Sequence, residues 1–123
     1  MQVRAVDFIG VAVPDMAQAQ AFYRDGLGLA VLFESDGWSE YDAGNVAVAL
    51  YKHEDAAQGP PSLRNAVVAF AVPDIRAAVE DVRQRGLSVV QEVEEYEPCF
   101  MATVHDPFGN AVMLHQRKDG TAG

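Results

Sequence analysis

The tripeptide Val-Pro-Asp occurs twice, at Val13-Pro14-Asp15 and at Val72-Pro73-Asp74, and each copy marks the same strand-to-helix junction. An apolar run precedes each copy, and an alanine-rich segment with helical spacing follows it. Proline cannot donate a hydrogen bond to a sheet ladder, so it indicates the end of a strand. The aspartate carboxylate accepts the free N–H groups of a first helical turn, so it indicates the start of a helix. The chain is therefore predicted to contain a duplicated strand–helix unit.

Around these junctions the same order is predicted twice: a strand, a helix and three further strands. The first half has strands at 3–13, 30–34, 38–42 and 46–53 and a helix at 15–25. The second half has strands at 66–72, 87–93, 99–105 and 111–116 and a helix at 74–85. Each helix is expected to stop at a glycine, Gly26 or Gly86, which accepts the left-handed conformation.

These elements predict one domain at 1–118, built from a module at 1–53 and a module at 66–118. The segment 54–65 is polar and rich in helix and strand breakers, so it is predicted to be a linker, and 119–123 a loose tail.

Composition limits the possible partners. The chain has 123 residues, half of them hydrophobic, and a net charge of -9 at pH 7. This charge repels phosphate backbones, which argues against nucleic acid, and it weakly favours a cationic ligand. Cys99 is the only cysteine, so no internal disulfide is expected. Without a secretory segment or an apolar run of membrane-spanning length, a cytoplasmic protein with no membrane partner is predicted.

The turn Asp106-Pro107-Phe108-Gly109-Asn110 precedes the last apolar strand. With the duplicated layout, this turn makes the segment 6–116 resemble the vicinal oxygen chelate superfamily, which includes glyoxalase I, extradiol dioxygenases and bleomycin resistance proteins. The resemblance implies an α+β fold in which two βαβββ modules form a cup-shaped mixed sheet. It also implies a homodimer.

Metal-dependent relatives hold an ion with four residues that face the cup. The resemblance places these positions at Phe8, Ala49, Val67 and Met113. None of the four is a ligand for a hard metal, and methionine is a soft, weak one. The three histidines follow no zinc-binding spacing. We therefore expect no metal and no other cofactor.

Alternation along the predicted strands separates two kinds of face. One face carries large aliphatic residues, as a surface under helices should. The other carries mostly small residues: Gly10, Ala12, Ala47, Ala49, Ala69 and Ala71. Small side chains on a curled sheet predict an apolar ligand cavity. The alternative is that a partner subunit or neighbouring strands close over them.

Several larger residues are candidates for ligand contacts. Trp38 offers a rigid ring for stacking, although it is equally suited to packing at a dimer edge. Tyr51 and His115 share the small-residue face as polar anchors, with a solvated rim position as the alternative. Tyr96 and Phe100 flank Pro98 and are expected at the cup mouth. The complete predicted set is Phe8, Trp38, Ala49, Tyr51, Val67, Tyr96, Phe100, Met113 and His115.

Two functions follow from this set. The first is a non-catalytic protein, similar to drug-resistance members of the superfamily, that sequesters a hydrophobic or aromatic small molecule by apolar burial and stacking. The second is a metal-independent isomerase, lyase or oxygenase that uses Tyr51 or His115 in acid–base chemistry. An enzyme needs a convergent pair of polar groups with shifted ionisation. The sequence offers at most one or two candidates, so binding is favoured and no catalytic residue is predicted.

Overall fold

The computed structural model describes residues 1–4, 6–53 and 67–123. The chain forms two compact units, 1–66 and 67–123. The predicted linker at 54–65 lies outside the described residues. No helix in the described parts of the chain is long and apolar enough to cross a bilayer.

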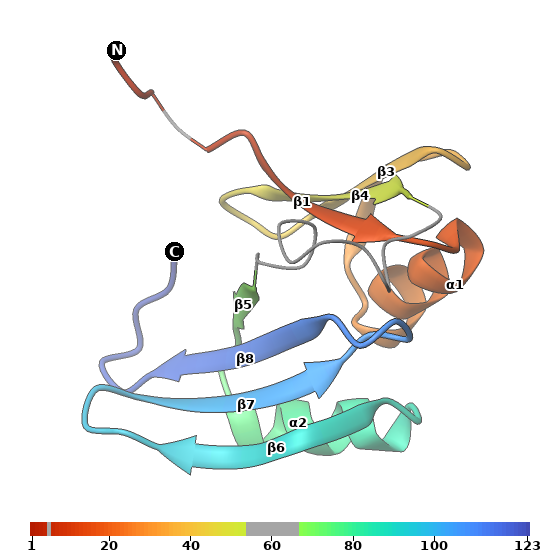
Figure 1. The fold of residues 1–123 in the computed structure, drawn as a ribbon. Helices are drawn as coiled ribbons and strands as arrows, with labels where there is room; N and C mark the ends of the chain where they lie inside the picture. Colours follow the sequence, from red (N-terminus) through yellow and green to blue (C-terminus); the bar gives the residue numbers. More distant parts are fainter. Residues whose placement is uncertain (5, 54–66) are drawn as a thin grey trace. The chain divides into compact units, whose positions relative to one another are not determined.

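The first unit is a four-stranded mixed sheet (Figure 1). Its elements are β1 (Phe8–Val13), α1 (Met16–Gln20), the π-helical turn η1 (Ala21–Gly26), β2 (Ala30–Glu34), β3 (Trp38–Asp42) and β4 (Ala47–Lys52). The strand order is β1-β4-β3-β2. β1 runs parallel to β4, and the other neighbours are antiparallel.

The second unit repeats this arrangement. Its elements are β5 (Val68–Ala71), α2 (Ile75–Gln84), β6 (Ser88–Glu95), β7 (Cys99–His105) and β8 (Ala111–Arg117). The strand order is β5-β8-β7-β6, with β5 parallel to β8 and the rest antiparallel. α2 packs against β6, β7 and β8 (Figure 1). The predicted α+β fold with two βαβββ modules is confirmed, as two separate four-stranded sheets.

Both Val-Pro-Asp junctions act as the sequence predicts. Asp15 Oδ1 accepts a hydrogen bond from the Gln18 N–H at 3.0 Å, and Asp74 Oδ1 accepts one from the Ala77 N–H at 3.1 Å. Each aspartate has an extended backbone and precedes the first helical residue. The carboxylates therefore satisfy first-turn donors that would otherwise lack partners.

The end of the first helix differs from the prediction. The Leu27 N–H donates to the Phe22 carbonyl at 2.8 Å, five residues back, so the helix ends in a widened π turn. This turn buries Phe22 and its neighbour Tyr23 together. The left-handed residue comes two positions later than predicted, at Gly28 (φ 75°) rather than Gly26.

The second helix ends as predicted. Gly86 takes the left-handed conformation (φ 80°), and α2 buries Ile75, Val79 and Val82 along one side. The predicted turn before the last strand is also present. Asp106 Oδ1 accepts from the N–H groups of Phe108 at 2.9 Å and Asn110 at 2.8 Å.

The core of each unit lies between its sheet and its helix. In the first unit the fully buried residues include Val13, Tyr41, Val48 and Leu50. In the second they include Ile75, Val104 and Val112. The large-aliphatic face is thus the helix-covered face, as predicted.

One strand boundary differs clearly: the predicted strand 3–13 begins only at Phe8, because the first residue of the paired strand β4 is Ala47, opposite Phe8.

Candidate ligand-binding face

Three aromatic side chains gather on the first sheet, on the face turned away from α1. Phe8, Trp38 and Tyr51, called the aromatic cluster below, come from β1, β3 and β4. Alternation places them opposite to the buried Val48 and Leu50. The Phe8 and Trp38 rings meet edge to face, with centroids 5.4 Å apart and planes at 89°. The Trp38 and Tyr51 rings are stacked, with centroids 6.4 Å apart and planes at 24°.

The small residues beneath the cluster explain why the rings converge. Phe8 is in register with Ala47 and Trp38 with Tyr51, so their backbones lie two rows apart on the sheet. The row between them contains Gly10 and Ala49. A Cβ atom at Gly10 would lie 3.5 Å from Tyr51 Cε1 and 4.0 Å from Phe8 Cε2. The rings therefore lean over this row, where larger side chains would hold them apart.

The exposed surface of this face is consequently aromatic. Ala49 is fully buried and Ala12 is 2% exposed, which differs from the predicted open floor of small residues. Phe8 is 47% exposed, and Trp38 and Tyr51 are half-buried. A ligand on this face would meet ring surfaces rather than methyl groups.

Glu40 also lies on this face, and it is not among the residues predicted from the sequence. Its Oε1 accepts a hydrogen bond from the Trp38 indole N–H at 2.8 Å. Glu40 is half-buried and lies in register with Ala49 on one side and Phe33 on the other. The spacing of Trp38 and Glu40, two residues apart on one strand, already places both on one face. The hydrogen bond fixes the orientation of the indole.

The second unit carries a different set on its corresponding face. Met113 lies in register with Ala69 and Thr103, and His115 with Ala71 and Met101. Met113 and His115 are half-buried. Val67 directly precedes β5 and is 50% exposed. The predicted residues Val67, Met113 and His115 thus belong to the second unit, and the aromatic cluster with Ala49 belongs to the first.

Two predicted residues lie elsewhere on the second unit. Phe100 is in register with Gln116, so it is on the helix-covered face, opposite to the face with His115. The Lys118 ammonium lies 5.1 Å from its ring centroid. This position differs from the predicted cup mouth, because strand alternation turns residue 100 to the opposite face from residue 101.

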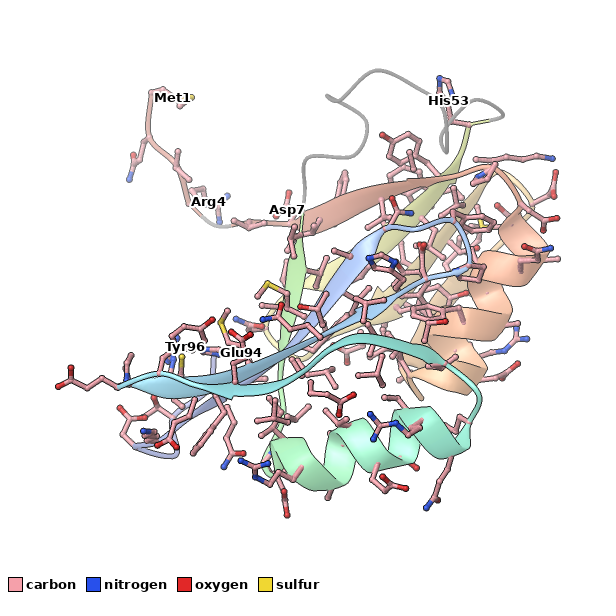
Figure 2. The ribbon with its side chains drawn as sticks, turned by 60° about the horizontal axis from the view of Figure 1, so that its bottom comes forward. Met1, Arg4, Asp7, His53, Glu94 and Tyr96 are labelled. Atoms are coloured by element: carbon pink, nitrogen blue, oxygen red, sulfur yellow. The ribbon has the colours of Figure 1, made fainter. Side chains whose placement is uncertain are left out.

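Tyr96 lies in the turn between β6 and β7, where its hydroxyl donates to Glu94 Oε2 at 2.6 Å (Figure 2). This hydrogen bond raises the pKa of Tyr96 and lowers the pKa of Glu94. Both groups are exposed. The pair therefore has the character of a solvated turn contact.

The groups at the four positions that the resemblance assigns to metal ligands do not fit a divalent ion. Phe8 and Ala49 in the first unit, and Val67 in the second, offer only hydrocarbon, and Met113 offers a thioether. In the described residues no group of three or more His, Cys, Asp or Glu side chains is placed to hold a metal.

A second polar group in the first unit is structural. The fully buried Tyr41 donates its hydroxyl to Glu34 Oε2 at 2.6 Å. Arg24 Nη1 donates to both Glu34 oxygens, at 2.9 and 3.0 Å. The pKa of Tyr41 is raised well above its usual range, mainly by burial and to a lesser extent by the hydrogen bond to Glu34. These residues tie η1 to β2 and β3 on the helix-covered face, away from the aromatic cluster.

A family model now identifies the architecture. Residues 5–114 match the model of the Glyoxalase/Bleomycin resistance protein/Dioxygenase superfamily. The chain belongs to this superfamily. The expected resemblance is therefore confirmed over most of the chain.

Solved structures of this superfamily share the fold. An antibiotic binding protein from a Streptomyces species is 20% identical, with a TM-score of 0.79 over 96% of this chain and 99% of that chain. A glyoxalase family protein from Bacillus anthracis is 21% identical, with a TM-score of 0.77 over 96% and 98%. Lactoylglutathione lyase from Agrobacterium tumefaciens is 16% identical, with a TM-score of 0.74 over 94% and 95%. No curated protein matches the chain by sequence.

Proposed function

We propose that this superfamily member is a non-catalytic binding protein that sequesters a planar aromatic small molecule. The observation that carries this proposal is the aromatic cluster, with Phe8 47% exposed on the face of the sheet opposite to α1. Aromatic faces bind planar ligands by stacking and by the burial of apolar surface. The edge-to-face contact and the indole hydrogen bond hold the rings in place before a ligand arrives, which reduces the entropy cost of binding.

The fold neighbours are compatible with this role and with an enzymatic one. One is an antibiotic binding protein and another is a lactoylglutathione lyase. At the β4 position that the resemblance assigns to a metal-ligating carboxylate, this chain has Ala49, which is fully buried in the row with Gly10. That substitution supports binding over metal-dependent catalysis.

The alternative of a metal-independent enzyme has less support. Acid–base catalysis requires titratable groups with displaced pKa values that converge on a substrate. Tyr41 has a raised pKa, but it is buried on the helix-covered face. The Glu94–Tyr96 pair has displaced pKa values, but it lies exposed in a turn. Neither group contacts the aromatic cluster in any described interaction.

The test is a fluorescence titration, because Trp38 is the only tryptophan. Planar tricyclic aromatics should quench its emission, and calorimetry should give matching dissociation constants. Phe8→Ala should weaken binding about fivefold to thirtyfold, since it removes one stacking surface and frees the indole edge. Phe108→Ala, in a turn of the second unit, is the matched control and should leave binding unchanged. Failure of every planar compound to bind, or equal binding by the Phe8→Ala variant, would contradict the proposal.

Native mass spectrometry of gently purified protein supplies a second measurement. It should report the retained ligand, the subunit stoichiometry and the metal content together. We also propose that the protein is a homodimer with no bound divalent ion. About one metal ion per subunit would contradict the second part.

A further inference from the structure

Glu40 places a carboxylate beside the aromatic cluster. From its position we infer that the preferred ligand is a cationic planar aromatic compound, with Glu40 as the residue that determines this specificity. The inference rests on the proposed function and adds to it the chemical class of the ligand.

The position of the Glu40 carboxylate supports this inference. Glu40 is on the same face as the cluster, in register with Ala49, the alanine of the row over which the rings converge. Its Oε1 is 2.8 Å from the Trp38 indole nitrogen. Any ligand stacked on Trp38 therefore lies within a few ångströms of a negative charge.

The negative charge of Glu40 is not neutralised by the described parts of the protein. Among the described residues, Glu40 accepts one hydrogen bond, from a neutral indole, and forms no ion pair. The positions that share its face on β1, β3 and β4 include no lysine or arginine. The nearby cation on β4, Lys52, alternates to the other side of that strand and pairs with Asp36 at 3.4 Å. No donor among the described residues contacts the second carboxylate oxygen.

The surroundings of Glu40 strengthen its attraction for a cationic ligand. Glu40 is half-buried beside apolar rings, where a charge is screened less than in open solvent. A cationic aromatic ligand gains twice at this position. Its charge pairs with the carboxylate, and its positive ring lies over the electron-rich face of Trp38. A neutral ligand of the same shape gains only the stacking.

A pair of nearly isosteric probes tests the inference. N-methylacridinium is a permanent cation, and acridine is neutral at mildly alkaline pH. The wild-type protein should bind the cation about tenfold more tightly than the neutral compound, measured by Trp38 quenching and calorimetry. Added salt should reduce this preference, because screening weakens the charge pair but not the stacking.

The variant Glu40→Gln separates charge from ring position. Glutamine keeps a carbonyl oxygen that accepts the indole N–H, so the indole orientation and the affinity for acridine should stay within about twofold of wild type. The preference for the cation should disappear. Glu97→Gln is the control for net charge. It removes the same charge from an exposed residue in the turn between β6 and β7 of the second unit, and it should retain the preference.

The outcomes are distinguishable. If neither probe binds the wild-type protein, the proposed function fails and this inference fails with it. If both probes bind equally, or if Glu40→Gln retains the tenfold preference, only the inference is overturned. Loss of the preference in Glu97→Gln as well as in Glu40→Gln would show that net charge acts rather than Glu40, which also overturns it.

Discussion

The two units share a topology and a helix-covered face but differ on the opposite face. On β4 the sequence Val48-Ala49-Leu50 occupies the same place as Val112-Met113-Leu114 on β8, each strand paired with the parallel strand of its unit. The valines and leucines are buried in both units, with at most 4% exposure. The middle residues differ, Ala49 in one and Met113 in the other. The residues under the helix thus follow from the fold, and the residues on the other face are where function can diverge.

This divergence explains why the aromatic cluster lies on the first unit. The row of Gly10 and Ala49 has no bulky side chain, so the Phe8 and Tyr51 rings approach Gly10 and both contact the Trp38 ring. The equivalent row in the second unit contains Ala69 and Met113, and its strands supply Met101 and Thr103 where β3 supplies Trp38 and Glu40. One duplicated scaffold therefore carries two faces of different chemistry.

The largest expected effects test whether the helix-covered faces are equivalent. Leu50→Ala and Leu114→Ala should each lower the free energy of unfolding by about 2–5 kcal/mol, because each removes buried methyl groups from a packed core. Urea denaturation followed by circular dichroism measures both. A loss below about 1 kcal/mol in one variant would mean that the two units do not depend equally on this position.

The next effect contrasts the opposite faces. Ala49 is fully buried beside the aromatic cluster, whereas Ala69 is exposed. Ala49→Leu should destabilise the protein by about 1–3 kcal/mol, because the added atoms collide with packed neighbours. Ala69→Leu should change stability by less than about 0.5 kcal/mol. The melting temperatures of the two variants test this difference. Equal melting temperatures for Ala49→Leu and Ala69→Leu would contradict the claim that the two faces are packed differently.

Much of the fold could be predicted because its signals are local. The strands 30–34, 38–42 and 99–105 agree with β2, β3 and β7 at both ends. Turn residues such as Asp36 and Gly37 stand next to them in the sequence. Residues 3, 4, 6 and 7 were wrongly predicted as strand, because the length of a strand depends on its partner. That partner, β4, starts opposite Phe8.

Less of the candidate site could be predicted, because it depends on strand order. Phe8 and Trp38 are far apart in the sequence, and they meet because β1 and β3 flank β4. Alternation put Phe8 and Tyr51 on the face with the small residues, but it could not show that Ala49 is fully buried there. Glu40 gained significance only from its hydrogen bond to the indole. Side-chain convergence of this kind has no local sequence signal.

A smaller effect concerns a feature of the first unit, the hydrogen-bonded Tyr41, Glu34 and Arg24. Tyr41→Phe should cost about 1–2 kcal/mol, because Glu34 loses one donor but keeps Arg24 at 2.9 Å. The raised pKa of Tyr41 means that its stabilising effect is complete below the unfolded value of about 10. It is lost as the pH rises toward the folded value. Urea denaturation at about pH 8 and about pH 11 should therefore show a steeper alkaline loss in wild type than in the variant. Parallel losses would contradict this account.

The smallest expected effects return to the repeated junctions, where the two units agree most closely. Asp15→Ala and Asp74→Ala should each cost about 0.5–2 kcal/mol, because each exposes a first-turn N–H that the carboxylate now satisfies. The first should cost more. In the second unit Gln116 Oε1 also accepts a hydrogen bond from the Ile75 N–H, at 2.9 Å, so that helix start keeps one side-chain acceptor. Asparagine at either position should restore most of the stability, since its side-chain oxygen caps as well as aspartate does. Thermal denaturation of the four variants measures the difference. A larger loss at Asp74 than at Asp15 would mean that Gln116 does not support the second helix start.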